Sequence, residues 1–302
     1  MSSDTTSRIP GPPTPVSLPS ILSEAEGKEF RAGIYRHFRE EGRDFPWRRT
    51  RDPWLILNSE IMLQQTRTET VAARWDAWAA AFPFPASLAE APLAEVLSLW
   101  KGLGYNRRAL SLRRTAEVLV FRHGGSVPRD ETELRSLPGV GPYTARAIRA
   151  FAFNLPGVLI ETNIRAVYLF YFYPDREKVT DRELEPLVEA TLDREDPRTW
   201  YYALMDYGAA LKKREPNPGR RSAAYSRQSP FEGSHRQVRS AVLHALSSRG
   251  PLAAEDLQEA AGRRIGTYAR EPGFPERLAR VTVELAAEGF LEVRDGTIRL
   301  RD

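Results

Sequence analysis

The chain contains no cysteine, which excludes several classes of site at once. It has no disulfide framework, no thiolate zinc site, no cysteine-ligated iron–sulfur cluster and no cysteine nucleophile. Its four histidines, at positions 37, 123, 235 and 244, lie far apart in the sequence and lack metal-ligand spacing. We therefore predict no catalytic metal, and we expect a cytoplasmic protein.

Long apolar runs are absent as well. No stretch is apolar for long enough to span a bilayer, and no Gly-rich nucleotide-binding loop occurs. The N-terminal residues are rich in Ser, Thr and Pro and lack the apolar core of a signal peptide. We predict a disordered tail over residues 1–24.

Lysine is scarce in a chain that is otherwise rich in basic residues. Five of the 44 basic residues are lysine, so arginine supplies the other 39, and the formal net charge is +4. Arginine binds phosphate bidentately and stacks on bases, which is compatible with a nucleic-acid partner. A bias in genomic base composition explains the same excess, so charge alone leaves the partner open.

The length of 302 residues suggests two domains. Apolar residues recur at three- and four-residue spacing in residues 25–213, which predicts a mainly α domain. Residues 214–234 are polar and basic and are predicted to form a linker. In residues 235–302 we expect three short helices and then two strands around an Asp295-Gly296 turn. This order resembles a winged-helix domain, which binds either DNA or another protein.

A glycine-containing motif, LPGVGPYTA, lies at residues 137–145 between two short predicted helices. Gly139 and Gly141 allow a hairpin whose backbone N–H groups, with the N-terminus of the second helix, present donors to a phosphate. A tight turn without a ligand is the alternative. The preceding Leu-Pro and the following Ala-rich helix favour a helix-hairpin-helix.

Glu60 lies on an apolar face of a predicted helix in residues 53–66. Partial desolvation on this face would raise the pKa of Glu60 and make it a proton donor near neutral pH. An ion pair with an arginine such as Arg48 is the alternative. A second polar cluster, containing Glu161 and Asn163, follows the hairpin motif and favours the catalytic interpretation.

Six motifs together resemble one family. They are FPWR (45–48), SEIMLQQT (59–66), LWKGLGY (99–105), LPGVGPYT (137–144), ETN (161–163) and ALMDYG (203–208). In this order they are similar to the A/G-specific adenine DNA glycosylases, the MutY branch of the helix-hairpin-helix superfamily that also contains endonuclease III.

The resemblance implies a two-lobed glycosylase domain with DNA between the lobes and the target adenine flipped into a pocket. Glu60 matches the acid that protonates N7 of the adenine, and Glu161 stands at the position of the anion beside the sugar. Tyr143 matches a tyrosine that supports the charged intermediate, and Asn163 matches the asparagine that holds the catalytic carboxylate. The implied walls of the base pocket are Trp47, Arg48, Leu63 and Asp206.

Gln65 and Tyr105 match residues that probe and wedge the duplex where the base has left, which would offset part of the cost of extrusion. For Tyr105, packing at a helix end is the alternative. The other predicted DNA contacts are Thr66, Leu103, Gly139, Gly141, Lys212, Lys213, Arg220 and Arg221.

Four departures from the family pattern matter. Glu161 replaces the usual Asp, so the arm that carries the carboxylate is one methylene longer. Tyr143 stands where bifunctional members carry a lysine nucleophile, which predicts a monofunctional enzyme. A basic segment with Lys212, Lys213, Arg220 and Arg221 replaces the four-cysteine loop. The winged-helix-like segment stands in place of the domain that recognises 8-oxoguanine.

We therefore predict a monomeric DNA N-glycosylase of base-excision repair that removes adenine opposite guanine or 8-oxoguanine from double-stranded DNA. It should need no cofactor, although the resemblance allows a monovalent cation at the hairpin carbonyls. A thymine or uracil mismatch glycosylase is one alternative. A non-catalytic protein that binds DNA or senses damage is the other.

Overall fold

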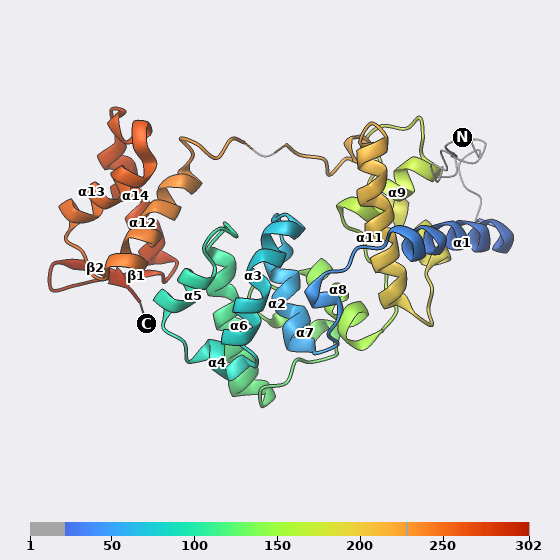
Figure 1. Ribbon diagram of the computed structural model, residues 1–302, viewed down its shortest axis with the longest axis horizontal. Helices are drawn as coiled ribbons and strands as arrows, with labels where there is room; N and C mark the ends of the chain where they lie inside the picture. Colours follow the sequence, from blue (N-terminus) through green and yellow to red (C-terminus); the bar gives the residue numbers. More distant parts are fainter. Residues whose placement is uncertain (1–21, 228, 302) are drawn as a thin grey trace, which may run out of the picture. The chain divides into compact units, whose positions relative to one another are not determined.

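The structure is a computed structural model that describes residues 22–227 and 229–301. The predicted tail lies outside the described residues as far as position 21. Helices dominate, which confirms the predicted mainly α class, and the chain forms two compact units (Figure 1). One unit contains the described chain up to Phe45 and Gly141–Arg227, and the other contains Pro46–Val140 and the described chain after Arg227. No described helix has both the length and the apolar character of a membrane span.

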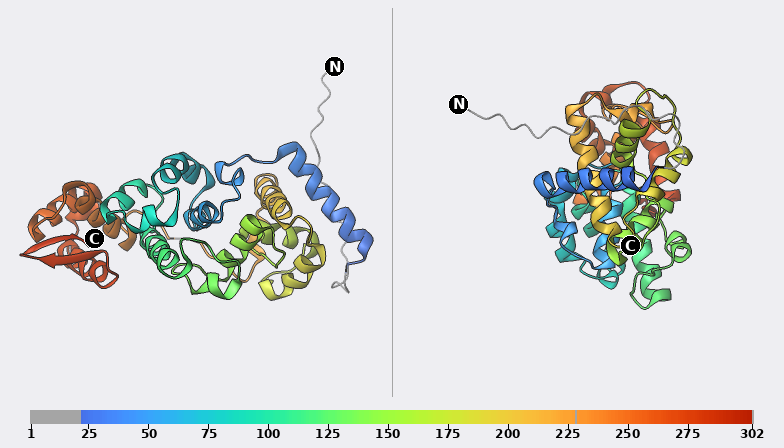
Figure 2. Two further views of the ribbon diagram at one scale, coloured as in Figure 1. Left: turned by 90° about the horizontal axis from the view of Figure 1, so that it is seen from below. Right: turned by 90° about the vertical axis from the view of Figure 1, so that its right-hand side faces the viewer.

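The first unit is built around α11, against which α1, α8 and α9 pack. Figure 2 shows α1 beside α11 in this unit. Helix α1 starts with a capping box, because Ser23 accepts from the Glu26 amide and Glu26 accepts from that of Ser23. The helices are α1 (Glu24–Glu41), α8 (Pro142–Phe153), α9 (Thr162–Phe172), α10 (Asp181–Thr191), α11 (Pro197–Arg214) and the 3-10 helix η2 (Pro218–Arg221).

Aromatic side chains fill the core of this unit. Phe30 of α1 lies 5.6 Å from Tyr168 and 6.0 Å from Trp200, measured between ring centroids. Trp200 and Tyr168 are fully buried. Burial of rings of this size stabilises a fold by about 1.5–3 kcal/mol each, so these contacts fix α1, α9 and α11 against one another.

The second unit begins with short helices around a tryptophan core. Trp78 and Trp100 are fully buried, and their ring centroids lie 5.2 Å apart. Trp78 Nε1 donates to the buried Asn58 Oδ1 at 2.8 Å. The elements are η1 (Pro46–Arg48), α2 (Pro53–Leu63), α3 (Thr68–Ala81), α4 (Pro85–Ala89), α5 (Leu93–Leu99), α6 (Arg107–His123) and α7 (Glu131–Ser136).

Three helices and a hairpin complete the second unit, in the order expected from the sequence. Asp295 and Gly296 have φ of 51° and 74°, as a two-residue type I′ turn requires. The strands pair antiparallel from Leu291 with Leu300 to Arg294 with Thr297. The elements are α12 (His235–Arg249), α13 (Ala254–Ile265), the 3-10 helix η3 (Gly266–Arg270), α14 (Phe274–Ala287), β1 (Leu291–Arg294) and β2 (Thr297–Leu300).

The C-terminal helices are joined to α6 through Glu288, which directly follows α14. Glu288 accepts from Arg107 at 2.5 Å and from Arg239 at 2.5 Å, while Arg114 Nη2 donates to its carbonyl at 2.8 Å. Burial alone would raise the pKa of Glu288, but the hydrogen bonds and charges of the arginines outweigh it and hold the pKa below its ordinary value. A charged contact therefore connects the C-terminal segment to the helices before the hairpin.

Candidate active site

Helix α2 carries Glu60 inside the second unit. Asp52 caps the helix by accepting from the amides of Trp54 and Leu55, and Pro53 occupies the first turn. Eight of the eleven side chains of α2 are apolar, and the helix is buried on most of its surface. Glu60 is 6% exposed, in agreement with the predicted burial.

The predicted pocket residues of this unit differ in their surroundings. Trp47 is 3% exposed and packs edge-to-face against Trp75, with ring centroids 5.9 Å apart. Arg48 in η1 and Leu63 at the end of α2 are half-buried. The packing of Trp47 against a core residue means that this side chain has a structural role whatever else it contacts.

The predicted probing residues, Gln65 and Tyr105, share an unusual backbone conformation. Their φ values are 54° and 45°, in the left-handed region that residues other than Gly, Asn and Asp rarely adopt. Gln65 is exposed, and Tyr105 is 36% exposed. Strain of this kind costs on the order of 1–3 kcal/mol and persists only where surrounding contacts enforce it.

Arg108 supplies the contacts that hold both turns. Its guanidinium donates to the carbonyls of Ile61 and Met62 at 2.8 and 2.9 Å, just before the Gln65 turn. It also donates to Leu103 O at 2.9 Å and Gly104 O at 3.0 Å, just before Tyr105. Burial lowers the pKa of Arg108 to about 10. We did not anticipate this residue, although it follows the 99–105 motif by three positions.

Thr66 and Leu103, predicted as DNA contacts, meet within the same network. Thr66 Oγ1 donates to Leu103 O at 2.9 Å and accepts from Arg108 at 2.9 Å. Leu103 is 3% exposed. The structure therefore brings the turns that carry Gln65 and Tyr105 together through polar contacts.

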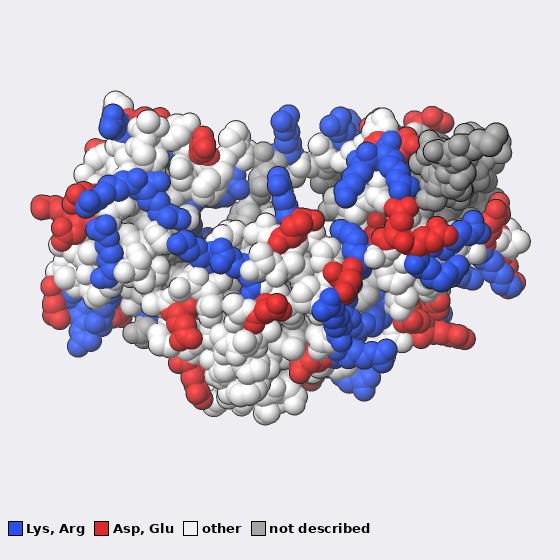
Figure 3. Space-filling view, in the orientation of Figure 1, with Lys and Arg blue, Asp and Glu red and all other residues white. Residues whose placement is uncertain are grey.

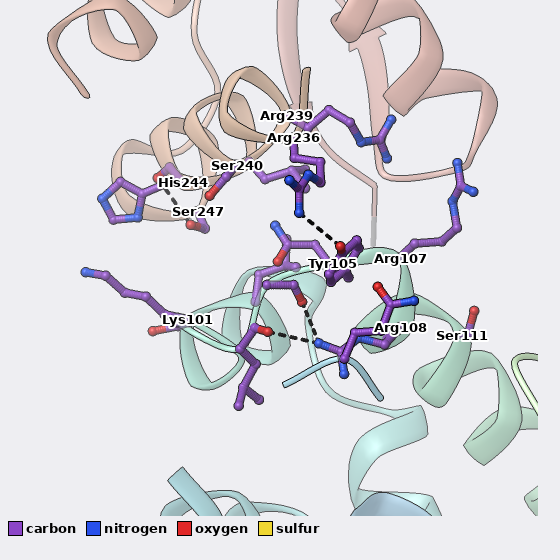
Figure 4. A pocket seen from close by; sticks show the side chains of 18 of the residues that line it. Lys101, Tyr105, Arg107, Arg108, Ser111, Arg236, Arg239, Ser240, His244 and Ser247 are labelled. Carbon is purple, nitrogen blue, oxygen red and sulfur yellow. Dashed lines mark hydrogen bonds between the residues drawn. The ribbon is translucent and has the colours of Figure 1, made fainter. Parts of the chain in front are cut away.

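Tyr105 is also held from the C-terminal segment. Arg236 of α12 donates from Nη1 to Tyr105 Oη at 2.9 Å (Figure 4). The guanidinium carbons of Arg236 and Arg108 lie 5.6 and 5.7 Å from the centre of the tyrosine ring. Sequence reasoning could not find Arg236, because the contact joins residues 131 positions apart.

The hairpin after α7 is fixed against α6. Thr115 Oγ1 donates to Pro138 O at 2.7 Å, and Val140 N donates to Leu137 O at 3.1 Å. Gly139 has φ of 78°, and a Cβ there would lie 2.8 Å from Ser111 Cβ, so the turn requires glycine. Gly141, which is exposed, is the N-cap residue with which α8 begins.

In the first unit, the predicted pair Glu161 and Asn163 is hydrogen-bonded. Glu161 is the N-cap of α9 and accepts from the amides of Asn163 at 2.7 Å and Ile164 at 2.9 Å. Its other oxygen accepts from Asn163 Nδ2 at 3.2 Å. Glu is rarely used to cap a helix, where Asp, Asn and Ser are preferred, so the longer arm is accommodated here by the capping geometry.

Lys212 extends this cluster. Its Nζ donates to Asn163 Oδ1 at 2.9 Å. Burial lowers the pKa of Lys212, and the charge of Glu161 opposes that shift. Lys212 was predicted to contact the DNA backbone from the basic segment that replaces the four-cysteine loop. It is half-buried in the last turn of α11, with Asn163 as its partner.

Close packing of α9 on α11 makes this cluster possible. A Cβ at Gly208 would lie 2.3 Å from the Asn163 carbonyl oxygen, so only glycine fits. Nearby on α11, the predicted pocket residue Asp206 is 2% exposed. It accepts from both the backbone N and the Nε of Arg43, each at 2.7 Å.

Tyr143 lies in the first turn of α8 and lines a small cavity of about 160 Å³ in the first unit. Arg146 and Asp181 line the same cavity. Asp181 accepts two hydrogen bonds from Arg165, at 2.6 and 2.7 Å, and these raise the pKa of the arginine. The tyrosine is half-buried, as a group that borders a site would be.

The basic segment after Leu211 is more ordered than a linker requires. Arg221 donates to Leu169 O at 3.0 Å and also to Pro174 O. Val179 and Ser222 form a parallel bridge beside it. Of the four predicted phosphate contacts in this segment, only Lys213 and Arg220 are exposed.

Within residues 22–227 and 229–301, no group of three or more His, Cys, Asp or Glu side chains could hold a metal ion. The sequence also lacks the cysteines that a thiolate-held cluster needs.

The sequence is similar to those of known DNA repair proteins. Residues 58–192 match the HhH-GPD superfamily of base excision DNA repair proteins. An adenine DNA glycosylase of Mycolicibacterium smegmatis is 36% identical over 229 residues, which cover 70% of this chain and 77% of that protein. A thymine/uracil-DNA glycosylase of Methanothermobacter thermautotrophicus is 32% identical over 187 residues, which cover 61% of this chain and 85% of that protein.

Solved structures are similar as well. A thermostable thymine-DNA glycosylase superposes with a TM-score of 0.54 at 30% identity and covers 61% of this chain and 86% of its own. The HhH-GPD match over residues 58–192 contains the C-terminal half of α2 with Glu60, the hairpin and the N-terminus of α9. This chain belongs to the HhH-GPD superfamily of base excision DNA repair proteins and is a DNA N-glycosylase similar to the adenine DNA glycosylases.

Proposed function

We propose that the enzyme removes adenine mispaired with guanine or 8-oxoguanine in double-stranded DNA. The observation that carries this proposal is the Glu161–Asn163–Lys212 cluster, in which backbone amides at a helix N-terminus and the Asn163 amide donate to one carboxylate, and the Lys212 ammonium donates to that amide. These contacts hold the carboxylate in one orientation. The similarity to adenine DNA glycosylases supports the choice of base.

The proposed chemistry divides the work between two carboxyl groups. An N-glycosidic bond breaks through an oxocarbenium-like state, so the base must gain a proton and the sugar needs an anion nearby. Glu60, buried on α2, would donate the proton to the departing adenine. Glu161 would stabilise the positive sugar, and Tyr143 would border the same intermediate. Water then completes the hydrolysis.

We also propose that the enzyme is monofunctional and works without an iron–sulfur cluster. Protein contacts hold the segment after Leu211, with Lys212 bonded to Asn163 and Arg221 bonded to carbonyl groups before Val179. Strand cleavage would need an amine that attacks the sugar, and Tyr143 cannot form a Schiff base. Borohydride treatment during turnover should therefore trap no protein–DNA adduct, and a trapped adduct would contradict this part of the proposal.

A panel of duplexes tests the function and the base together. Oligonucleotides that contain A·8-oxoG, A·G, T·G or U·G pairs are incubated with the protein and then cleaved with alkali at abasic sites. We expect cleavage of the adenine strand opposite 8-oxoguanine and guanine. Undiminished binding without release of any base would instead indicate a protein that only senses damage.

A second candidate base is thymine or uracil opposite guanine. The thymine/uracil-DNA glycosylase relative is 32% identical and is matched over 85% of its length, so the same scaffold accommodates a pyrimidine in that protein. Cleavage of the thymine or uracil strand in the panel, with intact adenine strands, would select this alternative.

A further inference from the structure

An open hollow of about 920 Å³ lies in the second unit between residues 97–108 and the helices α12 and α13 (Figure 4). Its lining includes no Asp or Glu among the described residues. Seven groups that carry or can carry positive charge face it. These are Lys101, Arg107, Arg108, Arg236, Arg239, His244 and Arg264.

Some of these cations already have partners. Arg107 and Arg239 bind Glu288, which does not line the hollow, and Arg108 binds backbone carbonyls. Lys101 and Arg264 differ, because no described residue forms an ion pair or hydrogen bond with either side chain. Both are exposed. Their charges therefore remain available to a ligand.

His244 lies close to the charges of both Lys101 and Arg264. Burial lowers the pKa of His244, and the charges of Arg264 and Lys101 lower it further. Arg264 comes from α13 and Lys101 from the turn after α5, so the field of both segments meets at α12. A concave, electropositive surface without carboxylates concentrates anions.

Hydroxyl and amide groups complete the lining. Ser240, Ser247 and Ser248 of α12 and Asn106 before α6 border the same hollow. Phosphate oxygens in DNA are bound by this mixture of Lys, Arg, Ser and Asn side chains. The hollow also includes the exposed turns of Gln65 and Tyr105, which the resemblance to the adenine DNA glycosylases assigns to the distorted duplex.

We propose that this hollow binds successive backbone phosphates of the DNA strand that passes the Gln65 and Tyr105 turns. Helices α12 and α13 of the C-terminal segment thus form one phosphate-binding side of the hollow. The inference rests on the proposed function only in taking DNA as the partner. It differs from the usual docking of a winged-helix segment, in which the third helix, here α14, would enter the major groove.

Arginines of α14 and of the following hairpin are bound to other protein groups, which favours α12 and α13 as the helices that contact the DNA. Arg277 donates to Gly233 O at 2.7 Å and contacts Glu271 at 3.5 Å, and Arg299 of β2 binds Glu292 at 2.6 Å. On the face drawn in Figure 3, Lys and Arg side chains run in a band over the C-terminal helices. Arg280 of α14 and Arg294 of β1 are exposed, and Arg294 Nε lies 3.9 Å from the exposed Asp295, so this pair of arginines serves as the charge-matched control.

Binding of the full-length protein to a fully paired duplex tests the inference. The Kd is measured by fluorescence anisotropy between about 50 and 200 mM salt for the parent, Lys101→Ala/Arg264→Ala and Arg280→Ala/Arg294→Ala. We expect the first pair to weaken binding and to reduce the slope of log K against log salt by about 0.9 for each lost contact. The second pair removes the same charge and should match the parent.

Two outcomes would overturn the inference. A parent-like slope for Lys101→Ala/Arg264→Ala would show that no phosphate contacts these cations. A loss confined to Arg280→Ala/Arg294→Ala would place the strand on α14 instead. Thermal melting of each variant confirms that it is folded. The binding test uses a fully paired duplex and measures no base release, so it stays valid if the excision assay disproves the proposed function. Likewise, the excision assay stays valid if this binding test fails.

The absence of cysteine permits a direct placement of the strand. Ser248→Cys introduces a single thiol into the hollow, and Ser87→Cys introduces one elsewhere in the same unit. Duplexes that carry one mismatch and an activated disulfide tether on one backbone phosphate are offered to each variant, so that the cysteine thiolate displaces the leaving thiol. We expect disulfide cross-links from Ser248→Cys to phosphates near the mismatch and none from Ser87→Cys. Absence of cross-links from Ser248→Cys, with normal duplex affinity, would refute the proposal.

Discussion

Lys212 Nζ lies 2.9 Å from Asn163 Oδ1, and the same asparagine donates to Glu161 at 3.2 Å. The ammonium therefore orients the amide so that its NH₂ group faces the carboxylate. An amide side chain can rotate by half a turn at little cost when nothing distinguishes its two ends. Lys212 supplies that distinction, which makes it a positioning residue for Glu161.

Lys212→Met should therefore slow base excision while preserving the fold. Met keeps most of the side-chain volume but leaves Asn163 Oδ1 without its donor, a loss of about 1–3 kcal/mol for a buried acceptor. We expect single-turnover excision to fall by about tenfold or more. The exposed neighbour Lys213 provides the control, and Lys213→Met should leave the rate unchanged. Equal rates for both variants would mean that Lys212 does not orient the site.

The two roles of Glu161, helix cap and catalytic anion, can be separated by substitution. Glu161→Asn keeps a capping side chain and removes the charge, so it should retain thermal stability and lose excision. Glu161→Ala loses both, with a cost of about 0.5–2 kcal/mol for the missing cap. Glu161→Asp should leave substantial activity. If Glu161→Asn excises bases at the parental rate, the carboxylate serves only as a cap.

Gly208→Ala tests the close approach of α11 to the N-terminus of α9. A methyl group there would lie 2.3 Å from the Asn163 carbonyl oxygen, so the helices must separate, at a cost of about 1–3 kcal/mol. We expect lower thermal stability and slower excision. At Gly27 of α1 a Cβ meets nothing within 4 Å, so Gly27→Ala should stabilise the protein by about 0.5–1 kcal/mol. Parental behaviour of Gly208→Ala would argue that the two helices adjust freely.

Local features of the structure could be predicted from the sequence. The turn at Asp295 and Gly296 is determined by residues that tolerate positive φ, and the strands alternate around it. The burial of Glu60 follows from the apolar residues on its own helix. Both signals lie within a few positions of the feature that they predict.

Contacts between distant segments could not be predicted in this way. Its neighbours in sequence do not distinguish Lys212 from the other basic residues of its segment. It is half-buried because Gly208 allows α11 to pack closely against α9, a contact between distant segments. The contacts that Arg108 makes with residues 61–62 and that Arg236 makes with Tyr105 likewise join segments 46 to 131 positions apart. The periodicity of apolar residues is a local signal and does not predict such pairs.

Glu60→Gln should abolish base release and preserve duplex binding. The amide keeps the shape of the carboxyl group but cannot donate the proton, and a general acid contributes about 100-fold or more to the rate. Single-turnover excision and anisotropy measure the two properties separately. Glu95→Gln on α5, at an exposed position of the same unit, controls for the loss of one charge. Normal excision by Glu60→Gln would remove Glu60 from the mechanism.

The contact between Glu288 and its two arginines should make stability depend on pH in a defined window. The folded-state pKa of Glu288 is lowered from 4.5, so the folded protein binds this proton less readily than the unfolded chain. The stabilisation is therefore fully present above pH 4.5 and is lost as the pH falls through the folded-state value. Glu288→Gln removes the charge at every pH.

We expect Glu288→Gln to lower the free energy of unfolding at neutral pH by about 1 kcal/mol, a modest value because Arg107 is largely exposed. The difference from the parent should shrink as the pH drops below 4.5, since Glu288 then becomes neutral in the parent as well. Urea unfolding at a series of pH values measures it. Glu255→Gln, at an exposed position of α13, should match the parent throughout. A difference that is constant from neutral to acidic pH would show that the shape of the side chain, and not its charge, holds the C-terminal helices to α6.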